Sequence, residues 1–150
     1  MSAYRNVVVG TDGSDSSLRA VEKAAALSGD SAATLYIACA YYPADSKASS
    51  QDADALKDDA YQITGSAPTQ EILRVARERA VAAGASSIEE RPVVGNPVDS
   101  LLELVGEVKA DLLVVGNRGL NSLTGRLLGS VPSDAARKAR CDVLIVHTTH

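Results

Sequence analysis

The chain has 150 residues, the length of a single domain, and its 45% hydrophobic content without Trp or Phe predicts a core of aliphatic side chains. A formal net charge of −4, with five Tyr as the only aromatic residues, argues against a surface that binds nucleic acid. No apolar run reaches the roughly 18 residues of a transmembrane helix, so we expect a cytoplasmic protein that binds neither nucleic acid nor membrane.

Short apolar runs alternate with helical patterns from the start of the chain. Residues 6–10 (NVVVG) predict a strand, and Ser14 or Ser16 can cap the helix that follows it. One face of that helix carries apolar residues, namely Leu18, Val21 and Ala25. Residues 34–40 (TLYIACA) predict the second strand.

The segment at about residues 43–67 interrupts this alternation. It is polar and rich in Ser, Asp and Ala, without a clear hydrophobic period. Because it is too long for an ordinary connection, we expect a mobile excursion. Both a tolerated surface insertion and a functional lid are consistent with its composition.

The next elements return to the regular pattern. Pro68 predicts the start of a helix, and Gly84 suits its C-terminal end. The predicted stripe of this helix consists of Ile72, Ala76, Arg79 and Ala83. Residues 87–94 form a third predicted strand, whose mixed polarity is typical of a sheet edge.

The last third of the chain predicts two helices and two strands. Asn96 followed by Pro97 is a strong helix start, because a capping side chain precedes a proline in the first turn. The apolar stripe that follows consists of Leu101, Leu104, Val105 and Val108. Residues 111–115 and 142–147 predict strands, and Ser130 begins the helix between them.

Five strands alternating with four helices predict an α/β fold. We expect one domain over residues 1–150, with a doubly wound parallel sheet that carries helices on both faces. In such sheets, ligands bind beyond the carboxyl ends of the strands, where the strand order reverses. The short turn at residues 10–13 and the glycine-rich loop that starts at Gly116 follow the first and fourth strands, and they are the candidate walls of such a site.

The loop after the fourth strand has the residue types of a phosphate site. Gly116 and Gly119 permit a tight turn and a close approach by a ligand, and Arg118 supplies a cation. Gly129 and Ser130 open a helix whose first N–H groups lack partners and attract a phosphate. A glycine-rich turn with a serine cap and no ligand is the alternative interpretation.

Two common nucleotide motifs are excluded. No lysine follows Gly129, so the loop is not a Walker A motif, and the G-x-G-x-x-G fingerprint does not occur there either. Rapid phosphoryl transfer is therefore poorly supported. Cys39 and Cys141 have no metal-type partners nearby, and we expect reduced thiols and no metal site.

The layout Gly116-x-x-Gly119, nine residues, then Gly129-Ser130 resembles the nucleotide-binding signature of the universal stress protein family. The segments NVVVGTDGSDSSLRAVEKA and GNPVDSLLELVGEVKADLLVVGNRG are also similar to that family. The resemblance spans the chain except the excursion at 43–67. It implies a Rossmann-like sheet of strand order 3-2-1-4-5 that binds an adenine nucleotide.

The resemblance also implies a set of binding residues. Asp12 would meet the adenine or ribose end, with the backbone of Gly10 and Thr11 beside it, and Ala40 would contact the base. The ribose and phosphates would lie against the remaining residues of the set, namely Gly116, Asn117, Arg118, Gly119, Leu120, Asn121, Ser122, Gly129, Ser130 and Val131. From the residues alone, Asp12 is equally well explained as a turn-forming residue that binds its own backbone.

The resemblance leads to a functional hypothesis with named alternatives. We expect a non-enzymatic sensor or buffer of an adenine nucleotide in stress response or signalling. Pro132 has no N–H, so the first turn of the last helix offers one backbone donor fewer to phosphate oxygens. AMP or cyclic AMP therefore competes with ATP as the expected ligand, and ATP could bring Mg²⁺ with it. The alternatives are a nucleotide-independent interaction scaffold and a slow ATPase.

Two related enzyme and signalling classes fit less well. A nucleotidyl-transferring enzyme of this type would carry an H-x-G-H motif, whereas the only histidines are His147 and His150. A receiver domain would need paired carboxylates after the first strand, where the chain offers Asp12 alone.

The last strand predicts a homodimer. The implied strand order places it at an edge, yet the four residues from 143 to 146 (VLIV) are all apolar, without alternation. An exposed apolar edge invites uncontrolled pairing, and a second copy would cover it in a closed interface.

Overall fold

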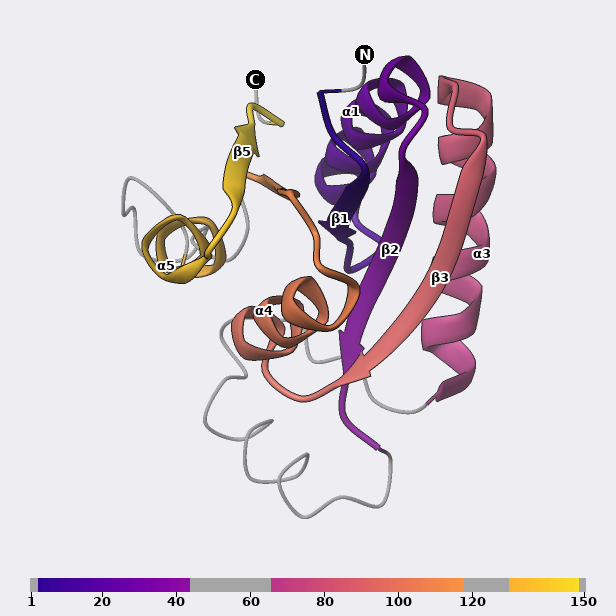
Figure 1. Cartoon of the computed structure of the whole chain (residues 1–150). Helices are drawn as coiled ribbons and strands as arrows, with labels where there is room; N and C mark the ends of the chain where they lie inside the picture. The colour runs from indigo at the N-terminus through magenta and orange to yellow at the C-terminus, as the bar shows by residue number, and fades with distance from the viewer. Residues whose placement is uncertain (1–2, 44–65, 118–129, 149–150) are drawn as a thin grey trace.

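The computed structural model describes residues 3–43, 66–117 and 130–148. In these residues, strands and helices alternate in the predicted order (Figure 1). The strands are β1 (Asn6–Gly10), β2 (Thr34–Tyr41), β3 (Ser87–Val94), β4 (Leu112–Gly116) and β5 (Asp142–Val146). The helices are α1 (Asp15–Ser31), α3 (Ser66–Ala83), α4 (Pro97–Val108) and α5 (Ser130–Lys138).

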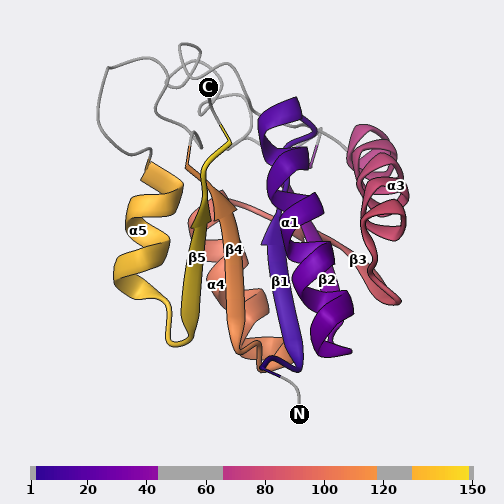
Figure 2. The same ribbon diagram turned by 90° about the horizontal axis from the view of Figure 1, so that it is seen from above.

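The sheet has the order β3-β2-β1-β4-β5, and every neighbouring pair is parallel. The predicted α/β class and strand order are therefore confirmed. α1 and α3 cover one face, and α4 and α5 cover the other (Figure 2). An apolar layer lies on each face of the sheet, and β1 contributes to both. Val7 and Val9 pack in the layer below α1 and α3, and Val8 packs in the layer below α4 and α5. All three are fully buried.

Side-chain caps start the two helices that follow β1 and β3. Ser14 Oγ accepts a hydrogen bond from Ser17 N (3.1 Å), so Ser14 and not Ser16 is the cap of α1. Asn96 Oδ1 accepts from Val98 N (2.9 Å), which confirms the predicted start of α4. Each such cap contributes about 1 kcal/mol and fixes where the chain turns away from the sheet.

α3 differs from its prediction in start and in buried face. It begins at Ser66, so residues 66–67 belong to the helix and not to the predicted excursion, whose residues 44–65 lie outside the described part of the chain. A proline in the first turn costs no helical hydrogen bond, so Pro68 does not have to be the first residue. The buried face consists of Thr69, Leu73, Ala76 and Ala80. Arg79 is exposed and pairs with Glu22 of α1 at 3.2 Å, so the predicted stripe was wrong at this position.

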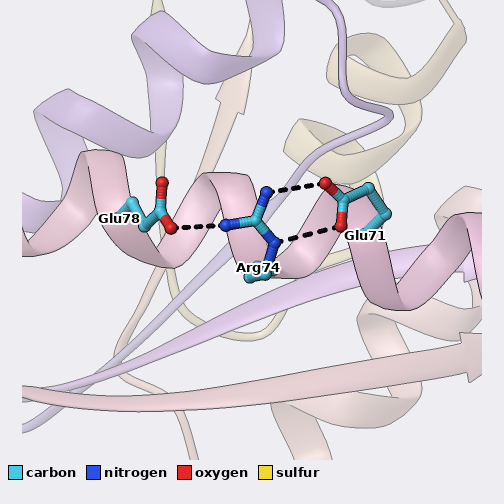
Figure 3. A network of polar contacts seen from close by, with 3 residues as sticks. All are labelled: Glu71, Arg74 and Glu78. Carbon is cyan, nitrogen blue, oxygen red and sulfur yellow. Dashed lines mark hydrogen bonds and ion pairs between the residues drawn. The ribbon is translucent and has the colours of Figure 1, made fainter.

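The outer face of α3 carries an ion-pair network (Figure 3). Arg74 donates to both carboxylate oxygens of Glu71 (2.7 and 3.0 Å) and to Glu78 (2.5 Å). The guanidinium hydrogen bonds lower the pKa of the Glu71 carboxyl. All three side chains are more than half exposed, so the network contributes little to stability and marks this face as the solvent face.

Several strand ends differ by one residue from the sequence expectations. β4 begins at Leu112, and the carboxylate of the preceding Asp111 accepts from Arg5 N (2.9 Å) and Asn6 N (3.1 Å) and so holds the start of β1. Gly116 is the last residue of β4, and β5 ends at Val146. Of the helices in the described ranges, none is long and apolar enough to cross a membrane.

α1 and α3 come into backbone contact near their C-terminal ends. A Cβ atom placed on Gly29 of α1 would lie 2.3 Å from the carbonyl oxygen of Gly84. Gly84 itself has φ +117°, a conformation that L side chains rarely adopt. The missing side chain of Gly29 therefore allows the close approach of α1 to the end of α3, whereas glycine at 84 is required by its backbone conformation.

We predict that Gly29→Ala lowers the free energy of unfolding by about 1–3 kcal/mol, because the new methyl group overlaps the Gly84 carbonyl. Gly106→Ala in α4 is the matched control, since no described atom lies within 4 Å of that Cβ position. It should raise the free energy of unfolding by about 0.5–1 kcal/mol through helix propensity. Urea denaturation of both variants checks this, and equal effects would contradict the proposed contact.

Candidate functional site

The β1–α1 turn and the end of β4 leave the sheet side by side. Val9 of β1 lies opposite Val114 of β4, so the residues that follow both strands reach the same carboxyl edge. The chain after β1 enters α1 on one face, and the chain after β4 leads to α5 on the other. The predicted reversal of strand order therefore lies between these two segments.

We call residues 11–14 the acidic turn, and their backbone N–H groups are all used within the protein. The hydrogen bonds run from Thr11 N to the Ala38 carbonyl (2.9 Å), Asp12 N to Ser17 Oγ (3.3 Å), Gly13 N to Thr11 Oγ1 (3.1 Å) and Ser14 N to Asp12 Oδ1 (2.9 Å). Gly13 has φ +87°, which requires glycine at this point of the turn. The acidic turn consequently offers acceptors to a ligand and no backbone donor.

Asp12 is a turn-forming residue, as one of its two sequence interpretations proposed. Its Oδ1 atom accepts from Ser14 N, two residues along the chain, which fixes the direction of the half-buried carboxylate. Among the described residues, no hydrogen bond reaches Oδ2. Asp12 can therefore hold its own turn and still present one charged acceptor to a ribose hydroxyl or an adenine amino group.

Ser17 supports the acidic turn from the first turn of α1. Its hydroxyl donates to the Ser14 carbonyl (3.0 Å), lies 2.7 Å from Thr11 Oγ1 and accepts from Asp12 N. This supporting residue was not predicted. The run of hydroxyl side chains in TDGSDSS is the sequence signal that could have pointed to it.

Cys39 lies beneath the acidic turn in the apolar layer between the sheet and α1. Burial first, and the Asp12 carboxylate second, raise the pKa of its thiol from 9.0 to about 12. Cys39 and Cys141 are both free thiols. Cys39 thus acts as an apolar packing residue rather than as a nucleophile.

The end of β4 is bound to the segment that follows β5. Asn117 N donates to the Val146 carbonyl (2.8 Å), and Asn117 Oδ1 accepts from both the backbone N (2.9 Å) and the hydroxyl (3.0 Å) of Thr148. Asn117 Nδ2 lies 3.2 Å from His147 Nδ1, which makes that ring nitrogen the acceptor. The amide oxygen is thus saturated, and only the Nδ2 side of Asn117 remains for a ligand.

Gly116, which was expected to clear space for a ligand, and Gly10, which was expected to place backbone beside it, are both packed against the protein itself. A Cβ atom on Gly116 would lie 3.3 Å from Thr148 Cγ2, and one on Gly10 would lie 3.0 Å from Leu101 Cδ1 of α4. Their missing side chains are thus explained by internal packing. The presence of glycine at these positions is therefore no evidence for a ligand.

The structure brings six predicted residues to one edge of the sheet: Gly10, Thr11, Asp12, Ala40, Gly116 and Asn117. Ala40 is half-buried near the end of β2, opposite Val93 of β3. Six others lie outside the described residues: Arg118, Gly119, Leu120, Asn121, Ser122 and Gly129. Ser130 and Val131 are the first residues of α5, and their side chains are also outside the described part.

Comparison with known proteins gives consistent matches. Residues 3–147 match the sequence pattern of a family that is described as "Universal stress protein family". Universal stress protein Rv1636 of Mycobacterium tuberculosis is 60% identical over 149 residues, which cover 99% of this chain and 100% of the relative. A universal stress protein crystallised in complex with cAMP has a TM-score of 0.78 and 56% identity, with 99% of this chain and 100% of that chain covered.

A more distant relative shows the same architecture. The universal stress protein from Archaeoglobus fulgidus in complex with dAMP has a TM-score of 0.68 at 25% identity. The match covers 95% of this chain and 97% of that chain. The five-stranded arrangement is thus shared at both high and low identity.

We predict that the buried Cys39 thiol makes stability fall above pH 9. Below pH 9, the Cys39 thiol is protonated in the folded and in the unfolded protein. Above pH 9, the unfolded chain loses this proton, whereas the folded protein keeps it up to about pH 12. The free energy of unfolding should fall as the pH rises, by up to about 1.4 kcal/mol per pH unit from this group.

Denaturation of the wild type and Cys39→Ala between pH 8 and about pH 10.5 measures this contribution, because the other titrating groups are common to both. The wild type should lose stability more steeply with pH. Parallel curves would show that Cys39 is not buried as described.

Proposed function

The chain belongs to the universal stress protein family, and we propose that it binds an adenine nucleotide at the carboxyl edge between β1 and β4. Two members of the family with similar structures were crystallised with cAMP and dAMP, and one of them shares 56% of its residues with this chain. We propose that binding, and not catalysis, is its role, in a cytoplasmic sensor or buffer for stress response or signalling. The two free thiols fit such a reducing compartment.

The distribution of donors and acceptors along the edge is the observation that carries this proposal. The acidic turn has no free backbone donor and one charged acceptor, Asp12 Oδ2, so it suits hydroxyl or amino groups and repels phosphate. α5 begins at Ser130, and the first N–H groups of a helix attract anions. A nucleotide therefore fits in one direction, with its base and ribose towards Asp12 and its phosphate towards α5.

A monophosphate fits the start of α5 better than a triphosphate does. Pro132 is the third residue of α5 and has no N–H to donate, which leaves fewer backbone donors for phosphate oxygens. We propose AMP or cyclic AMP as the ligand, with ATP and its Mg²⁺ as the weaker alternative. The cAMP complex of the relative at 56% identity supports the same choice.

The simplest experiment looks for the nucleotide that the protein carries. Denaturing purified protein and analysing the released small molecules by mass spectrometry should yield an adenine nucleotide. Calorimetry with AMP, cyclic AMP and ATP then ranks the ligands. Binding weaker than about millimolar for all three, or roughly 4 kcal/mol, would leave the interaction scaffold as the better function, and steady phosphate release from ATP would favour the slow ATPase.

The position of β5 at the end of the sheet supports a second proposal, a homodimer. β5 ends the sheet order, and Asn117 N reaches the Val146 carbonyl, so Val146 directs its backbone polar groups towards β4. Alternation along a strand then directs those of Val143 and Ile145 away from β4. Both side chains are half-buried, and a second copy paired along this edge would satisfy the outward backbone groups.

We predict that Asp12→Asn weakens nucleotide binding about 10- to 100-fold. This factor corresponds to the loss of one charge-assisted hydrogen bond, which contributes roughly 1.5–3 kcal/mol. Asparagine keeps an oxygen for Ser14 N, so the turn should survive, but the second acceptor becomes a donor. Asp30→Asn at the far end of α1 is the matched charge control. Calorimetry with AMP and cyclic AMP checks both variants, and unchanged affinity for Asp12→Asn would remove Asp12 from the site.

We predict that Val143→Pro converts the dimer to a monomer, because proline removes an outward N–H that pairing would use. Val143→Ala is the control, since it loses side-chain volume but keeps the N–H. Light scattering over a dilution series measures both. Wild-type protein that is only monomeric at micromolar concentration would disprove the dimer itself.

A further inference from the structure

We propose that Thr148 is a positioning residue for nucleotide binding, because it holds the end of β4 against the start of α1 and so sets the spacing of the two segments that flank the ligand. The inference rests on the nucleotide binding proposed above. Thr148 follows β5 and is not part of the glycine-rich nucleotide-binding signature. No motif or hydrophobic period in the sequence pointed to this residue.

Every polar group of Thr148 is used within the protein. Its side chain and backbone are buried, with 3% of the residue exposed. The backbone N and the hydroxyl both donate to Asn117 Oδ1 (2.9 and 3.0 Å), and the carbonyl accepts from Arg19 Nη1 of α1 (2.9 Å). Ser16 Oγ lies 2.5 Å from the Thr148 hydroxyl oxygen. Thr148 is therefore bonded to α1 on one side and to the end of β4 on the other.

The hydroxyl hydrogen bonds run in one direction. Thr148 has a single hydroxyl hydrogen, and Asn117 Oδ1 can only accept, so that hydrogen points to Asn117. Ser16 must then donate to the Thr148 oxygen. The side chain of valine has the same shape as that of threonine but can neither donate nor accept. Thr148→Val therefore removes both hydroxyl hydrogen bonds and keeps the backbone hydrogen bonds to Asn117 and Arg19.

The two ends of this chain of hydrogen bonds lie at the proposed binding edge. Ser16 stands in the first turn of α1, next to the Ser14 cap whose N–H fixes the Asp12 carboxylate. Asn117 directly follows Gly116, where the chain leaves β4. Misplacing either end by a fraction of an ångström would misalign the acceptor at Asp12 with the donors on the β4 side, which costs affinity without any lost ligand contact.

The methyl group of Thr148 adds a steric part to the same arrangement. A Cβ atom on Gly116 would lie 3.3 Å from Thr148 Cγ2 and 3.4 Å from its Oγ1. Glycine at 116 and threonine at 148 therefore fit together, and the close packing prevents the end of β4 from shifting towards α1.

The test measures the affinity for AMP and cyclic AMP by calorimetry in Thr148→Val and Thr148→Ser. Loss of both hydroxyl links should weaken binding roughly tenfold in Thr148→Val. Serine keeps the hydroxyl and should restore affinity to within about twofold of the wild type. Thr34→Val is the matched control, because Thr34 Oγ1 meets Ser87 Oγ at 3.4 Å where β2 and β3 begin, and it should bind like the wild type.

A double-mutant cycle separates positioning from a merely structural role. Ser16→Ala removes one of the two links, so it should weaken binding less than Thr148→Val, and the double variant should be no weaker than Thr148→Val alone. In ligand-free protein, the amide NMR signals of Asp12 and Asn117 should shift in Thr148→Val and return towards wild-type positions in Thr148→Ser.

The outcomes distinguish this inference from the proposed function. Wild-type protein that binds neither nucleotide overturns the function, and the positioning role falls with it. Wild-type binding with equal affinity in Thr148→Val leaves the function standing and overturns the positioning role. If Thr148→Val fails to fold, Ser16→Ala decides the matter, and unchanged affinity in that variant counts against the inference.

Discussion

The positions of β1 and β4 in the sheet constrain where this protein can hold a ligand. The two strands are hydrogen-bonded neighbours, but the chain leaves β1 for α1 on one face and leaves β4 towards α5 on the other. Because the following segments diverge, none of the helices that the structure describes is placed directly over the space between the two carboxyl ends. Polar side chains from the acidic turn and from Asn117 gather there instead. The strand order thus determines where the candidate site lies.

The acidic turn gives this edge a direction. A short turn after a parallel strand normally leaves several N–H groups free, and free N–H groups favour anions. Here Ser17 Oγ, Thr11 Oγ1 and Asp12 Oδ1 each accept one of them. The acidic turn is then left with the charged acceptor of Asp12 and with no free backbone N–H group. Such a surface suits the hydroxyl groups of a sugar or the amino group of a base, and it disfavours a phosphate. In the proposed binding mode, the phosphate therefore lies elsewhere on the same edge, at the start of α5.

Local and periodic features were predictable from the sequence, whereas contacts between distant segments were not. The cap at Asn96 depends on signals within a few residues and was predicted, and the turn formed by Asp12 was one of two interpretations of that residue. The strand order was predicted from the family resemblance and not from local signals. The predicted stripe of α3 was wrong at Arg79, because alanine occurs on several faces of this helix and weakens the amphipathic pattern. Asn117 and Thr148 are 31 residues apart, and no local pattern connects them.

Glycine illustrates why residue type alone is weak evidence for a site. At the sequence level, Gly116 indicates space for a ligand, and the family resemblance places the backbone of Gly10 beside that ligand. In the structure, Leu101 packs on Gly10 and Thr148 packs on Gly116, so the same absence of a Cβ serves the core and the β4–β5 end. The question that decides between packing and binding is which atoms occupy the space that a Cβ would take. At these two positions the protein's own side chains occupy it, and the case for a nucleotide rests on the polarity of the edge and on the relatives that bind one.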